Sequence, residues 1–147
     1  MSPYLILIRN ETRSRIRHAS IHDALTHLLR TYDVARGEVS VLLTDDLTLR
    51  QLNAQYRGKD EATDVLTFPG GPHGPLGDIA ISVDTAKRQA KARRDLLAHE
   101  IVYLSIHGGL HLLGFEDETE EGRDDMVRRM NEVALQLGLT PDPDWSS

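Results

Sequence analysis

Residues 96–113, LLAHEIVYLSIHGGLHLL, are mostly apolar and contain no proline, and they set the fold class of the chain. A stretch of this length and composition predicts a helix that is buried nearly all round. Gly114 follows it at the left-handed position that commonly ends a helix. The preceding residues 87–94, KRQAKARR, are strongly cationic. We therefore expect residues 84–113 to form two helices or one bent helix.

Four short β-prone stretches precede the buried helix: YLILI (4–8), EVSVLLT (38–44), DVLTFPG (64–70) and DIAISV (78–83). Ser20 is predicted to cap a helix whose apolar side carries Ile21, Ala24, Leu25, Leu28 and Leu29. Asp45 and Asp46 favour the start of a second helix, which Gly58 ends.

A last helix follows the buried one and ends near Gly138. The tail after it, TPDPDWSS (140–147), is predicted to be irregular. The apolar side of this helix carries Met126, Met130, Val133 and Leu137. No repeat or internal linker divides the 147 residues, which is about the length of one domain. Strands mixed with helices in this order predict a single compact α+β domain over residues 1–147, with a small mixed β-sheet and several helices.

The composition excludes several classes of protein. The chain has no cysteine, so disulfide frameworks, cysteine zinc fingers and thiol catalysis are ruled out. The N-terminal MSPYLILIRN lacks a cleavage site of small residues, and no stretch approaches the roughly 20 apolar residues of a membrane span, so we expect a cytoplasmic protein. The net charge of −6 argues against indiscriminate binding to nucleic acid but allows a local basic patch.

The buried helix carries two histidines, His107 and His111, at a spacing that places them on one face. Both can present a ring nitrogen to one point, as a zinc ion requires. Gly114 would turn the chain so that Asp117 supplies an oxygen to the same ion. Three protein ligands and one open position are the pattern of a catalytic zinc site.

Other interpretations of these positions stay open. A histidine pair at this spacing is more often structural, and Asp117 could instead cap the last helix. Gly108 and Gly109 are poor helix residues, which suggests that another backbone or a substrate passes close to this turn. The spacing also resembles the HExxHxxGxxH motif of metzincin peptidases, but Gly108 stands where that motif has its glutamate base. A metallopeptidase is therefore disfavoured.

Three blocks of sequence carry a more specific resemblance: NAQYRGKDEATDVLTFP (53–69), LGDIAIS (76–82) and HGGLHLLGF (107–115). Together they resemble the YbeY-type rRNA maturation endoribonucleases, whose usual pattern is N…YRGKD.xTDVLSFP, then LGDI, then HGxLHLLGYDH. The match runs in order from about residue 40 to residue 135. The chain departs from the pattern at Thr67, in place of serine, and at Asp117, in place of the last histidine.

The resemblance implies a metal-dependent endoribonuclease, a hydrolase of RNA phosphodiester bonds, that matures the 3′ end of small-subunit rRNA and acts in ribosome quality control. It implies that His107 and His111 bind the metal, with Asp117 at the third position, and that Arg57 is the catalytic cation. Zn²⁺ is the expected ion, one per chain. The aspartate should weaken zinc binding and shift the preference toward Mn²⁺ or Fe²⁺.

Ribosomal RNA in the small subunit is the expected partner. The sequence leaves open whether a ribosomal protein or a GTPase delivers it, and it does not give the oligomeric state. The attacking group could be water or the ribose 2′-OH. In both cases Arg57 would stabilise the growing charge on the phosphate, with Lys59 as a secondary charge. No general base is evident.

Two further questions concern RNA binding. The cationic residues 87–94 could attract RNA, or they could be a solvated helix face. Aromatic residues make up 5% of the chain, which argues against base-specific reading.

The alternative function is a non-catalytic, RNA-binding ribosome assembly factor with an altered metal site. Asp117 favours it, whereas the retained Arg57 and the histidine pair speak against it.

Overall fold

The chain forms four strands and five helices within residues 2–146, the part that this computed structural model describes. The strands are β1 (Tyr4–Asn10), β2 (Gly37–Thr44), β3 (Val65–Pro69) and β4 (Gly77–Ser82). The helices are α1 (His18–Thr31), α2 (Asp46–Arg57), α3 (Val83–Arg93), α4 (Leu97–Leu112) and α5 (Glu120–Gln136). Each predicted strand is present, and residues 84–113 form two helices rather than one bent helix.

The strands form one sheet in the order β1-β2-β4-β3. β1 and β2 are parallel, as are β2 and β4, whereas β3 runs antiparallel to β4. Parallel neighbours need a crossover connection, and α1 supplies the one from β1 to β2. The sheet is therefore mixed, which confirms the predicted single α+β domain with a small mixed sheet.

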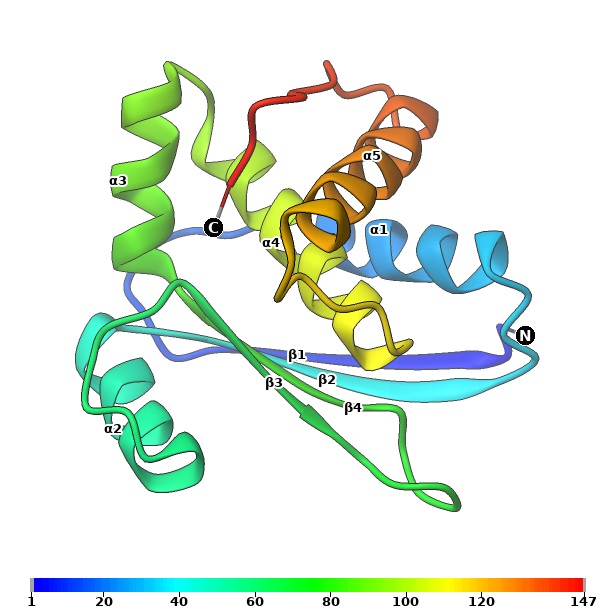
Figure 1. Ribbon diagram of the computed structural model, residues 1–147, viewed down its shortest axis with the longest axis horizontal. Helices are drawn as coiled ribbons and strands as arrows, with labels where there is room; N and C mark the ends of the chain where they lie inside the picture. The colour runs from blue at the N-terminus through cyan, green and yellow to red at the C-terminus, as the bar shows by residue number, and fades with distance from the viewer. Residues whose placement is uncertain (1, 147) are drawn as a thin grey trace.

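Helices cover the two faces of the sheet unequally. Figure 1 shows α1, α4 and α5 together on one face, with α2 on the opposite face. Side chains alternate between the faces along each strand. Ile79 and Ile81 of β4 accordingly join the main core under the helices, while Ala80 between them packs with Leu49 of α2 in a smaller cluster. The wide helical layer on one face positions α4 against the sheet.

Helix α4 is buried nearly all round, as predicted, because it contacts α1, α3, α5, β3 and β4. Every residue from 100 to 110 is buried. A Cβ on Gly108 would lie 2.8 Å from Cγ2 of Ile79, and one on Gly109 would lie 2.4 Å from Cδ2 of Leu28. The expectation that a backbone or a substrate passes here is wrong, since side chains of the core occupy this space.

Within residues 2–146 no helix is long and apolar enough to cross a membrane.

The ends of α2 follow the local sequence, whereas the start of α1 does not. Asp45 caps α2 by accepting a hydrogen bond from the Thr48 backbone N–H at 2.9 Å, and Gly58 ends this helix with φ 68°. The prediction that Ser20 caps α1 is wrong. The helix begins at His18, and the backbone N–H of Ser20 donates to the carbonyl of Arg17 inside the first turn.

Candidate metal centre

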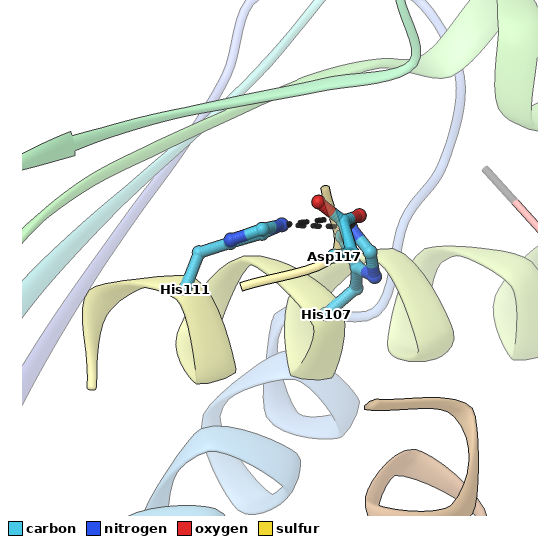
Figure 2. A group of neighbouring side chains, drawn as sticks. All are labelled: His107, His111 and Asp117. Atoms are coloured by element: carbon cyan, nitrogen blue, oxygen red, sulfur yellow. Dashed lines mark hydrogen bonds and ion pairs between the residues drawn. The ribbon is translucent and has the colours of Figure 1, made fainter. Parts of the chain in front are cut away.

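Three side chains converge at the C-terminal half of α4 (Figure 2). Nε2 of His107 lies 3.2 Å from Nε2 of His111. Oδ2 of Asp117 lies 3.4 Å from the first of these nitrogens and 3.5 Å from the second. Gly114, with φ 99°, turns the chain after α4 so that Asp117 returns to the histidine pair. The structure thus brings the three predicted ligands together.

The spacing of these three atoms fits a divalent metal ion. Ligands about 2.0–2.1 Å from a tetrahedral ion lie roughly 3.3–3.4 Å from one another. The three observed separations, 3.2, 3.4 and 3.5 Å, bracket that value. Two imidazole nitrogens and one carboxylate oxygen are also a donor set that binds catalytic zinc. The residues present therefore fit one ion with a coordination position left open.

The protonation state of His107 suits metal binding. Burial, reinforced by the neighbouring His111, lowers the pKa of His107 to about 4, although Asp117 acts in the opposite direction. The imidazole is consequently neutral at pH 7, the form in which a ring nitrogen can donate its lone pair to a metal.

Asp117 is not the cap of the last helix. Thr119 occupies that position, and its hydroxyl accepts a hydrogen bond from the Gly122 backbone N–H at 2.9 Å. The carboxylate of Asp117 is instead directed at the two histidines. The interpretation of Asp117 as a helix cap is therefore wrong, and this carboxylate is available as a ligand.

The three ligands open onto a cavity of about 410 Å³. Arg57, at the end of α2, and Lys59, in the loop after it, line the same cavity. A larger cavity of about 630 Å³ lies on the other side of the sheet, where Leu52, Tyr56 and apolar strand residues line it. We take the smaller cavity as the functional site because it combines metal-binding donors with cations that can bind phosphate.

Besides Asp117, three carboxylates line this cavity that the sequence did not predict as site residues: the buried Asp64 and the exposed Glu116 and Glu118. Asp64 precedes β3, is 5% exposed, and accepts a hydrogen bond from Gln89 at 3.2 Å. Burial raises the pKa of Asp64, which is a common property of carboxylates at sites of proton transfer. The TDVLTFP block was visible in the sequence, but nothing in it indicated that this side chain is buried and lines the cavity of the histidines.

The cationic residues 87–94 do not form a uniform surface strip. Arg93 is largely buried and donates to both carboxylate oxygens of Glu100, itself only 2% exposed. Arg88 pairs with Asp46 at 2.9 Å. Two of the five cations that could attract RNA therefore form ion pairs with carboxylates of the same chain. Arg88 is nonetheless exposed, as are Lys87, Lys91 and Arg94.

Comparison with known proteins gives a consistent family. Residues 7–138 match the family model described as Endoribonuclease YbeY. The Endoribonuclease YbeY of Rhodopseudomonas palustris is 42% identical over 119 residues, and the match covers 76% of this chain and 62% of that protein. The Endoribonuclease YbeY of Thermus thermophilus is 42% identical over 137 residues, with coverage of 89% and 98%.

A solved structure shares the fold. The solution structure of TM1509 from Thermotoga maritima aligns with a TM-score of 0.62 and 25% identity, and the alignment covers 97% of each chain. The arrangement of one mixed sheet and its helices is therefore shared over nearly the whole length of both proteins.

Proposed function

Because the chain belongs to the Endoribonuclease YbeY family, we propose that it is a metal-dependent endoribonuclease acting on single-stranded RNA. The proposed role is maturation of the small-subunit rRNA 3′ end and ribosome quality control in the cytoplasm, by one domain spanning residues 1–147. The observation that carries the proposal is the His107, His111 and Asp117 donor set, with separations of 3.2–3.5 Å, on the cavity that Arg57 also lines.

Each residue of the site has a proposed task. His107, His111 and Asp117 would hold one divalent ion, for which zinc is our proposal. When bound, such an ion supplies Lewis acidity to the scissile phosphate. Arg57 would bind two phosphate oxygens through its planar guanidinium and stabilise the charge that grows there during cleavage. Lys59 would add a compact positive charge that attracts the RNA backbone.

The same cavity supports a substrate chosen by its backbone rather than its bases. Apart from the two histidines, no residue that lines it in the described part of the chain is aromatic. Stacking platforms are the usual means by which proteins hold unpaired bases. Arg57 and Lys59 instead offer contacts to phosphate, so we propose that the site has little base preference of its own. Binding to a particular rRNA end would then depend on a partner, such as a ribosomal protein or a GTPase.

The experiment that tests the function is cleavage of an end-labelled, single-stranded RNA carrying a small-subunit rRNA 3′ end. We expect discrete fragments with zinc-loaded protein and none after chelation, with activity restored by zinc, Mn²⁺ or Fe²⁺. RNA that is bound but stays intact with every metal would support the assembly-factor alternative instead. Hydrolysis of casein by the same preparation would favour a metallopeptidase.

The third ligand allows a test of metal preference. Asp117→His should bind zinc more tightly, by about tenfold or more, because an imidazole is a softer donor than a carboxylate and suits zinc better than Mn²⁺. Competition against a chromophoric chelator would measure both affinities, with Asp124→His on α5 as the surface control. Zinc affinity that is unchanged or weaker in Asp117→His would contradict our view of this ligand.

A further inference from the structure

The segment after α5 is irregular, as predicted, but it is firmly attached to the core. The side chain of Asn131 in α5 binds both the backbone carbonyl and the backbone N–H of Asp142, at 2.9 and 2.7 Å. The hydroxyl of Tyr103 in α4 donates to the carbonyl of Thr140 at 2.8 Å. These bonds direct the tail back across α4, and its Trp145 is only 3% exposed.

Four groups fix the indole of Trp145. Its Nε1–H donates to Oε1 of Glu100 at 2.9 Å. The ring stacks on Tyr103, with centroids 6.2 Å apart, and the guanidinium carbon of Arg93 lies 5.1 Å from its centroid. The fourth neighbour is His107, whose ring centroid lies 5.3 Å away at an angle of 46°. The indole of Trp145 is therefore fixed in place, and it packs against His107, one of the three candidate metal ligands.

Packing against Trp145 matters for His107 because the imidazole lacks, within the described residues, the hydrogen bond that usually fixes the orientation of a metal-binding histidine. A histidine that binds a metal through one nitrogen normally donates its other N–H to a carboxylate, a carbonyl or water, which fixes the ring. Nε2 of His107 faces His111 and Asp117, and its Nδ1 is buried without a hydrogen-bond partner among residues 2–146. The orientation of the ring therefore depends on packing, and χ2 of histidine is intrinsically broad.

We propose that Trp145, held in place by Glu100 and Arg93, is a positioning residue that keeps the His107 ring in its metal-binding orientation. This inference rests on the proposed function, since it assumes that the His107 site binds a metal. Trp145 lies beyond residues 7–138, the part that matches the family model.

Zinc affinity and the visible spectrum of the cobalt-substituted protein test the proposal without measuring activity. Trp145→Ala should weaken zinc binding about 10–100-fold, the range typical of residues that orient a metal ligand. It should also shift the cobalt absorption bands, because the angle of the His107 donor would change. Trp145→Phe retains an aromatic ring and should recover most of the affinity. If the alanine variant does not fold, Trp145→Leu, which fills part of the space without a ring, takes its place and should show the same shift of the cobalt bands.

Ile6→Ala is the matched control, because it removes a buried side chain from β1, at the opposite edge of the sheet from β3. It should lower thermal stability while leaving zinc affinity and the cobalt spectrum unchanged. Equal affinity and equal spectra in wild type and Trp145→Ala would overturn the positioning role and leave the metal centre intact. A wild-type chain that binds neither zinc nor cobalt would overturn the metal centre and this inference with it.

Discussion

Replacing His111 with alanine should empty the metal centre and reduce RNA cleavage to background. The variant keeps only one imidazole and one carboxylate, and two donors hold a divalent ion far more weakly than three. Residues that merely orient a ligand are worth about 10–100-fold in metal affinity, so removing a ligand should cost more than about 100-fold. Metal content by plasma mass spectrometry and cleavage of labelled RNA would measure both effects.

His99→Ala is the matched control, because His99 lies on the same helix and, among the described residues, its side chain bonds only to Asp95 in the loop before α4. It should keep about one metal per chain and full cleavage. His111 is a better choice than His107 for this test. The side chain of His107 is 7% exposed and packs on Trp145, so its removal would also disturb the core. Full metal content in His111→Ala would show that the ligand set is wrong.

The part of the site that could be predicted depends on short separations in the sequence. His107 and His111 share a helix face for any regular α-helix, and Gly114 was recognisable as the turn that brings Asp117 back. These geometric relations span eleven residues and need no knowledge of the tertiary fold. The strands were also predictable, because each is a short β-prone stretch, and their order among the helices predicted the small mixed sheet.

The part that could not be predicted depends on contacts between distant segments. Trp145 and Glu100 are 45 residues apart, and nothing in TPDPDWSS indicates that its tryptophan enters the core. Arg93 was one cation in a cationic run, and only the break between α3 and α4 brings it onto Glu100. Ser20 shows the opposite failure, because α1 begins at His18, three residues before the start that a Ser20 cap would give, and Ser20 lies inside the first turn.

Arg57→Ala should lower the turnover of RNA cleavage by about 100–1000-fold while leaving the metal bound. A positioned donor that meets charge developing in the transition state is typically worth that much, because it acts on the barrier more than on substrate binding. Arg57 is exposed at the end of α2 and lines the cavity of the metal ligands, so its loss should not disturb the core. KM should change only a few-fold, since Lys59 and the metal still attract the backbone.

Single-turnover cleavage, RNA binding and metal content would be measured on the same preparations of Arg57→Ala, Arg57→Lys and Arg30→Ala. Arg30 is an exposed arginine of α1 that does not line the cavity, so its loss controls for net charge. Arg57→Lys should recover only part of the rate, because an ammonium cannot bind two phosphate oxygens in one plane. Full cleavage by Arg57→Ala with RNA still bound would remove Arg57 from the reaction, whereas parallel losses in binding and cleavage would make it a binding residue only.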